Sequence, residues 1–364
     1  MIIDCHGHYT TAPTEHSAYR AEQLAALHAR EIEDPAGALE DPAGALEDPA
    51  GSGPPGALPR PPSIGDDVLR RSVEGNQLRL MDERGIDLVL LSPQASAMGH
   101  HVPDRRVAVD WARACNELVG RVAGLYPHRF APVCQLPQTP GGGLDDAVAE
   151  LRRCVEEQGF VGANLNPDPS GGHWNSPPLT DPHWYPLYEA LVELEVPAMI
   201  HVSGSCNPNF HALGAHYLNA DTTAFMQFLE GDLFERFPRL RLVIPHGGGA
   251  VPYHWGRYQG LAVRLGRPPV EQQVMGNVSF DTCVYHQAGI DLLTTVVPSA
   301  NLLFGSEMLG AVRGDNPETG SGWDDTRLYV DRAPLADDAR AAVYEGNVRA
   351  AYPRLDARLR GQGR

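Results

Sequence analysis

The amino terminus, "MIIDCHGHYT", places two histidines one residue apart at the end of a short apolar run. In a β-strand, residues i and i+2 point to the same side, so the imidazoles of His6 and His8 project together. Two neutral imidazoles that converge in this way can bind one metal ion. Such a pair also occurs near strand ends without function, so the prediction depends on which other residues lie beside it.

Three other residues with metal-binding or acid–base chemistry follow apolar segments far along the chain. They are His201 in "MIHVS", His246 in "VIPHGGG" and Glu307 in "LFGSE". Taken singly, such a histidine is more often a hydrogen-bonded core residue, and such a glutamate a solvated carboxylate. If all three end parallel strands of one barrel, they meet the amino-terminal pair at one rim, which predicts a metal site.

The segments that must carry these residues alternate between apolar, β-rich runs and longer amphipathic ones. Strands separated by helices form right-handed parallel units, and eight of them predict an α/β fold, a closed (β/α)8 TIM barrel spanning residues 1–364 as a single domain. The expected strands span 1–8, 87–93, 130–137, 162–167, 197–203, 241–249, 278–284 and 301–307. The expected helices lie near 72–85, 104–126, 144–158, 182–194, 221–236, 287–297 and 335–350.

One segment departs from this alternation. Residues 33–51 read "EDPAGALEDPAGALEDPAG", and the proline in each copy excludes a continuous helix. Together with the Pro/Gly-rich stretch that follows, this predicts a flexible insertion at about 33–62. A tolerated repeat expansion in a surface loop explains it, and a lid is the alternative because the insertion follows the first strand.

Composition excludes several classes of partner and mechanism. The formal net charge of −17 argues against nucleic acid and anionic membranes, and no apolar run is long enough to span a bilayer. All 29 basic residues are arginine, which excludes a Schiff base or a carbamylated lysine. The start carries no signal-peptide pattern and the six cysteines form no CxxC pair, so we expect reduced thiols in a cytoplasmic protein. A homodimer is the commonest assembly for such a chain.

The strand-end pattern resembles the amidohydrolase superfamily, with HxH on strand one, histidines on strands five and six, and an acid on strand eight. The absence of lysine fits its mononuclear decarboxylase and hydratase branch. The matching stretches are "IIDCHGHYTTAP", "NLNPDPSGGHW", "SPPLTD", "HYLNADTTAFMQ", "VIPHGGGAVPYHWGR", "FDTCVYHQ" and "YEGN". The decarboxylases of this branch typically end strand eight with Asp, whereas Glu307 in "FGSEM" matches its hydratases.

This resemblance implies one Zn²⁺ held by His6, His8, His201 and Glu307, with His246 acting as an acid or base. The residues alone do not separate a ligand role from an acid–base role for His246, and Mn²⁺ or Fe²⁺ would also suit the site. The implied reaction adds water across a conjugated carbon–carbon double bond, with Glu307 as the base and His246 as the acid. The implied substrate is a small, six-carbon unsaturated polycarboxylate from ring cleavage of a dihydroxybenzoate or gallate.

A polycarboxylate requires cationic or hydrogen-bonding partners. Arg313, in the loop after strand eight, is the first candidate, although a surface role explains it about as well. The other candidates are Asn164 and Asn166 on strand four and His173 and Trp174 in the loop after it. Weaker candidates are Tyr217, Tyr285 and His286.

Three other functions remain open from the residues. The first is a metal-dependent decarboxylase of a related acid, which CO₂ release would reveal. The second is an amide or lactone hydrolase, and the third is a metal-binding scaffold without activity. A serine hydrolase is disfavoured, because "HGGG" occurs without a G-x-S-x-G motif.

Overall fold

The computed structural model describes residues 1–33, 58–211 and 214–364. Its centre is one sheet of eight parallel strands paired in chain order, which confirms the predicted (β/α)8 barrel. The strands are β1 (Ile3–Tyr9), β2 (Leu88–Pro93), β3 (Phe130–Gln135), β4 (Gly162–Leu165), β5 (Ala198–Ile200), β6 (Leu242–Ile244), β7 (Val278–Asp281) and β8 (Leu302–Leu303). Most of the insertion predicted at 33–62 lies outside the described residues.

Backbone hydrogen bonds between the first strand and the chain at the last strand close the ring. The amide of Cys5 donates to the carbonyl of Phe304, and the amide of Glu307 donates to the carbonyl of His6, both at 2.8 Å. No edge is therefore left unpaired between β8 and β1, which removes the row of free donors and acceptors that an open sheet exposes.

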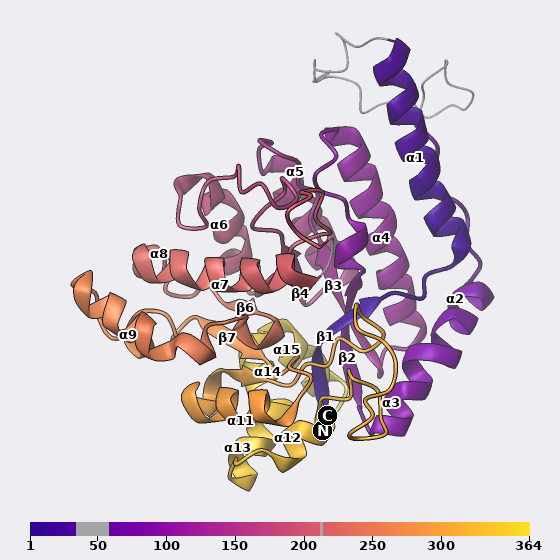
Figure 1. Cartoon of the computed structure of the whole chain (residues 1–364). Coiled ribbons are helices and arrows are strands. Elements are labelled where there is room, and N and C mark those ends of the chain that lie inside the picture. The colour runs from indigo at the N-terminus through magenta and orange to yellow at the C-terminus, as the bar shows by residue number, and fades with distance from the viewer. Residues whose placement is uncertain (34–57, 212–213) are drawn as a thin grey trace.

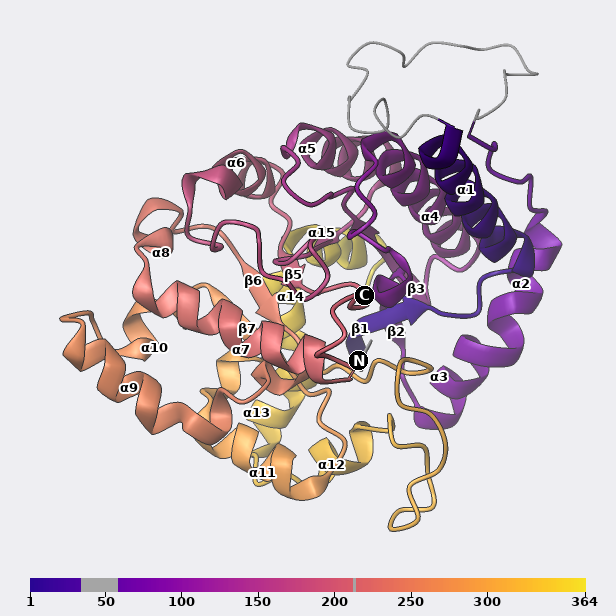
Figure 2. The ribbon, with the colours of Figure 1, turned by 45° about the horizontal axis from the view of Figure 1, so that its top comes forward.

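The α-helices surround the strands (Figures 1 and 2). They are α1 (Thr14–Glu33), α2 (Asp66–Val73), α3 (Arg79–Arg84), α4 (Arg105–Leu125), α5 (Asp145–Arg152), α6 (Tyr185–Glu193), α7 (Gly214–Glu230), α8 (Leu233–Arg236), α9 (Trp255–Arg264), α10 (Val270–Gln273), α11 (Gln287–Val296), α12 (Arg327–Arg332), α13 (Asp337–Ala341), α14 (Asn347–Ala351) and α15 (Pro353–Gly361). Each predicted helical stretch contains a helix, but α1, α9, α10, α12 and α15 were not predicted, and α2 and α7 begin earlier than expected. No helix in the described part of the chain is long and apolar enough to cross a bilayer.

The barrel interior forms its own core, separate from the larger core between strands and helices. Inward-pointing side chains such as Ile3, Leu90 and Met199 pack with a second set from α14, α15 and the residue between them, namely Val348, Tyr352, Leu355 and Leu359. These carboxyl-terminal helices fill the end of the barrel where the strands begin, so the opposite end is the one open to a ligand.

We expect Leu355→Ala to lower the free energy of unfolding by about 2–5 kcal/mol, because it leaves a cavity beneath the barrel. Leu355 is fully buried, whereas Leu265, at the end of α9, is 47% exposed. Leu265→Ala is therefore the matched control and should cost much less. Urea unfolding followed by circular dichroism measures both, and equal losses would contradict the assigned role of α15.

Candidate metal centre and acid–base pair

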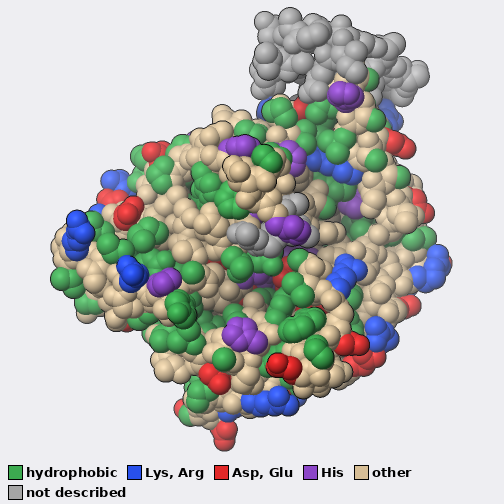
Figure 3. Space-filling model, viewed as in Figure 1, with side chains coloured by type: hydrophobic (Ala, Val, Ile, Leu, Met, Phe, Trp, Pro, Cys, Tyr) green, Lys and Arg blue, Asp and Glu red, His purple; other side chains and the backbone are tan. Residues whose placement is uncertain are grey.

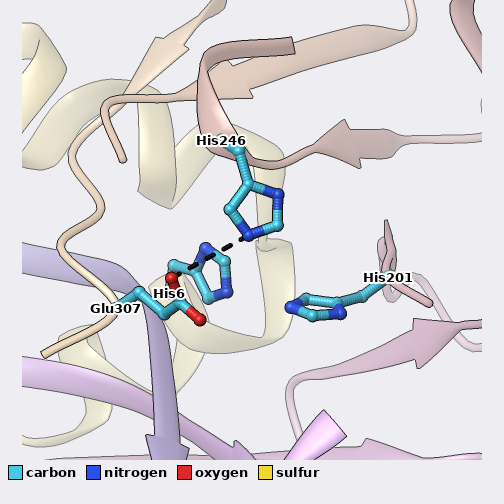
Figure 4. A group of neighbouring side chains, drawn as sticks. All are labelled: His6, His201, His246 and Glu307. Atoms are coloured by element: carbon cyan, nitrogen blue, oxygen red, sulfur yellow. Dashed lines mark ion pairs between the residues drawn. The ribbon is translucent and has the colours of Figure 1, made fainter. Parts of the chain in front are cut away.

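Five side chains meet where the strands end. His6 and His8 lie on β1, and His201, His246 and Glu307 follow β5, β6 and β8. Atoms of His6, His201, His246 and Glu307 that can bind a metal all lie within 4.8 Å of one another, and Figure 4 shows these side chains pointing toward a common centre. The Nε2 atom of His8 lies 3.1 Å from that of His6 and 3.2 Å from that of His201. The structure thus brings together all five residues that the strand-end positions selected.

The outer nitrogen of each of three imidazoles is held by a fixed partner. His6 Nδ1 lies 2.7 Å from Asp281 Oδ2, and His201 Nδ1 lies 2.9 Å from the carbonyl oxygen of Val202. A carbonyl only accepts, so His201 carries its hydrogen on Nδ1 and turns the Nε2 lone pair toward the centre. His8 Nδ1 lies 2.7 Å from the hydroxyl of Ser92. Such partners orient metal-binding histidines and fix their tautomers.

Burial sets the charge of these groups. Desolvation, aided by the charge of neighbouring histidines, lowers the pKa of His8 and of His201 well below the ordinary value. Burial also lowers the pKa of His6, but the hydrogen bond and charge of Asp281 outweigh it and raise that pKa overall. Burial raises the pKa of Asp281, but its hydrogen bond to His6 and the charges of His6 and His246 together outweigh burial and lower that pKa overall. The centre therefore combines two neutral imidazoles, those of His8 and His201, with the imidazole of His6, which is hydrogen-bonded to the Asp281 carboxylate.

This donor set fits a divalent cation. Lone pairs of neutral imidazoles only 3.1–3.2 Å apart repel each other unless a cation or a proton lies between them. His246 Nε2 is buried and has no hydrogen-bond partner among the described residues. Imidazole nitrogens and a carboxylate are ligands typical of Zn²⁺, Mn²⁺ and Fe²⁺. The side chains alone do not fix the identity of the metal.

His246 is held on two sides by one helix. Asp221 Oδ2 lies 2.9 Å from His246 Nδ1, and the ring of Tyr217 stacks on the imidazole at 4.3 Å between centroids. Tyr217 and Asp221 are four residues apart on α7 and so share a face of that helix. Burial lowers the pKa of His246 to about 4, and its Nε2 lies 3.9 Å from Glu307 Oε2. An imidazole nitrogen and a carboxylate oxygen therefore face each other across the centre.

Glu307 is positioned by its backbone and by Tyr285. Its φ of 51° lies in the left-handed region, which non-glycine residues rarely adopt outside functional sites and turns. The hydroxyl of Tyr285 donates to Glu307 Oε2 at 3.0 Å. A Cβ atom on Gly310 would lie 2.7 Å from the Glu307 carboxyl carbon, so only glycine permits this close turn. His246, with a φ of 52°, is similarly constrained.

A cavity of about 260 Å³ opens beside the centre. Its lining includes His8, His201 and Glu307, together with Tyr217 and Arg313. Arg313 is exposed, and its guanidinium donates to the carbonyls of Leu309 and Gly310. Two larger hollows lie elsewhere, one beside α15 and one beside α4, and neither includes any of the five converging residues.

The other predicted substrate-binding residues do not line this cavity. Asn164 is buried and donates to Ser92 Oγ at 3.2 Å, and Asn166 bonds to His100 within the loops above the barrel. His173 is exposed, and Trp174 is half-buried with a φ of 53°. Their binding roles stay predictions, and the contacts described favour a supporting role for the two asparagines.

Sequence reasoning missed the residues that hold the histidines. Asp281 ends β7, so the strand-end rule that selected the other five also pointed to it. Ser92 lies near the end of β2 in the same way. Asp221 lies inside α7 and carried no such signal. His286, a weaker candidate, caps α11 by accepting from the amide of Gly289 at 3.1 Å.

Comparison with known proteins agrees with this geometry. The model of the family described as "Amidohydrolase" matches residues 3–354. The chain is 55% identical over 363 residues to a 2-keto-4-carboxy-3-hexenedioate hydratase from Sphingobium sp., covering 100% of this chain and 99% of that protein. It also resembles the crystal structure of a 4-oxalomesaconate hydratase from Rhodopseudomonas palustris, with a TM-score of 0.84, 51% identity and coverage of 100% and 99% of the two chains. A γ-resorcylate decarboxylase from Rhizobium sp. is 31% identical, over 54% of this chain and 62% of its own length.

We expect Asp281→Asn to weaken zinc binding roughly 10–100-fold, because an amide supports the His6 imidazole less well than a carboxylate does. Asp67→Asn, on the exposed surface of α2, should leave it unchanged. Competition with a chromophoric chelator measures the zinc affinity, and thermal unfolding of the metal-free proteins checks the fold. Equal affinities in folded Asp281→Asn and wild type would contradict the role assigned to Asp281.

Proposed function

The chain belongs to the amidohydrolase family, and from that premise we propose that it is a metal-dependent hydratase of 4-oxalomesaconate or its enol tautomer 4-carboxy-2-hydroxymuconate. The product would be 4-carboxy-4-hydroxy-2-oxoadipate, formed during breakdown of protocatechuate or gallate. The observation that carries the proposal is the paired arrangement of Glu307 and His246, whose Oε2 and Nε2 atoms face each other at 3.9 Å. Two hydratases that match the whole chain support it.

His6, His8, His201 and Glu307 would hold the cation, with Zn²⁺ as the first choice and Mn²⁺ or Fe²⁺ as alternatives. When bound, it would supply Lewis-acid polarisation of the substrate oxygens. The buried, neutral state of His8 and His201 keeps their lone pairs available for this purpose. In this proposal His246 remains outside the ligand set and is assigned the role of the acid, with Tyr217 and Asp221 positioning its ring from α7.

The protein's own groups would move two protons. Glu307 takes one proton from the attacking water, whose oxygen bonds to one carbon of the double bond. His246 gives a proton from Nε2 to the neighbouring carbon, and Asp221 stabilises the imidazolium before transfer. A proton passing from Glu307 back to His246 restores both groups. Each positioned proton transfer contributes roughly 10²–10⁴-fold to the rate.

The substrate's carboxylates would be met by Arg313, which lines the cavity. Its planar guanidinium can bind a carboxylate in a bidentate manner, as a solvated lysine could not.

Assembly as a homodimer stays a prediction.

Decarboxylation of a related acid is the second candidate, because the γ-resorcylate decarboxylase aligns with about half of this chain at 31% identity. Strand eight distinguishes the two, since Glu307 occupies the position where we expect Asp in decarboxylases. Measuring CO₂ alongside loss of the substrate's ultraviolet absorbance separates the reactions. Stoichiometric CO₂ release would overturn the hydratase proposal.

We expect Glu307→Gln and His246→Asn to lower kcat at least about 10²-fold, because each removes one proton transfer. His246→Asn should retain its metal, whereas Glu307→Gln should weaken metal binding as well. His128→Asn, at an exposed position, is the control. Turnover of 4-oxalomesaconate and metal content by mass spectrometry measure these effects, and full activity in His246→Asn would refute its assignment as the acid.

A further inference from the structure

The cavity beside the metal centre contains little positive charge for a substrate with three carboxylates. Arg313 is the one arginine among its described lining residues, and burial holds His8 and His201 neutral. In Figure 3 most arginines lie near the edge of the visible face, whereas histidines gather toward its middle. The cation and Arg313 can each bind one carboxylate of the substrate. A third carboxylate must then be bound by neutral hydrogen-bond donors.

One such donor is the hydroxyl of Thr10, two residues beyond His8. This hydroxyl is buried and has no hydrogen-bond partner among the described residues. Buried polar groups are nearly always satisfied, so an exception needs an explanation. Thr10 lines the cavity beside the metal centre and also a smaller adjoining hollow of about 70 Å³. A ligand group that enters between these hollows can accept the missing hydrogen bond.

Ser96 is a second donor on the same wall of the cavity. Its hydroxyl accepts from Gln94 Nε2 at 3.0 Å, and no described residue accepts the hydroxyl hydrogen in turn. Its backbone carbonyl accepts from the amide of Gly204 at 3.3 Å, which ties it to the loop after β5. Gln94, like Thr10, lines both hollows. The two hydroxyls follow β1 and β2, which are neighbouring strands.

We propose that the hydroxyls of Thr10 and Ser96 form a subsite that binds one carboxylate of the substrate. Gln94, which donates to the Ser96 hydroxyl, helps to position it. A carboxylate accepts several hydrogen bonds at once, and bonds to a charged acceptor are stronger than neutral ones. The subsite would distinguish tricarboxylates from dicarboxylates of similar length. The identity of the natural substrate rests on the proposed function, but the subsite itself can be tested without turnover.

The test compares two adjacent threonines. Thr10→Val removes the unpartnered hydroxyl while keeping the shape of the side chain, and Thr11→Val removes a hydroxyl that donates to Gln77 Oε1 at 2.8 Å. Calorimetry measures binding of propane-1,2,3-tricarboxylate and of glutarate to the zinc-loaded proteins, and thermal unfolding gives their Tm. Ser96→Ala is a second variant of the subsite.

We expect Thr10→Val and Ser96→Ala to weaken tricarboxylate binding roughly tenfold, with glutarate affected less than about twofold. The Tm of Thr10→Val should not fall, because the lost hydroxyl makes no bond within the protein. Thr11→Val should lower the Tm and leave both ligands unaffected. Equal weakening of both ligands, or unchanged binding in Thr10→Val, would overturn the subsite. Failure of the wild type to hydrate 4-oxalomesaconate would instead overturn the proposed function.

Discussion

The hydrogen bond from the Glu307 amide to the His6 carbonyl connects the first strand to the segment that follows the last strand. It closes the ring of strands, and it also sets an acidic residue beside the histidine pair. A shift of this pairing by one residue would turn His6 and His8 away from the centre, because strand side chains alternate between faces. The register of β1 against the segment after β8 therefore determines both the closure of the barrel and the placement of the histidine pair beside Glu307.

The second constraint is the exclusion of water from a polar centre. Imidazoles in bulk water titrate near neutral pH and change partners freely, whereas His8 and His201 are buried, neutral and fixed. Their outer nitrogens are occupied by Ser92 and the Val202 carbonyl, so only the inner nitrogens remain for a ligand. The cost of burying these groups is offset when a cation binds, which couples metal binding to folding stability.

Much of the fold could be predicted from the sequence, because strands buried on both faces read as near-continuous apolar runs. Helix α1 was missed because the face it buries carries His16, Tyr19 and Gln23, so no apolar stripe marks it. Helix α9 was missed because glycines interrupt it and Val263 faces solvent. The convergence of five residues followed from strand ends and topology, whereas the contact between Asp221 and His246 depends on how α7 lies against the barrel.

Helix α7 contacts His246 through two side chains that belong to one helical turn. Tyr217 and Asp221 cannot be released separately by a movement of the helix, since a slide by one residue rotates both by about 100°. A displacement of α7 would therefore change both contacts of the imidazole at the same time. In the proposed mechanism such a displacement would remove the ring orientation and the charge stabilisation of His246 together, so the placement of one helix would govern the proton donor.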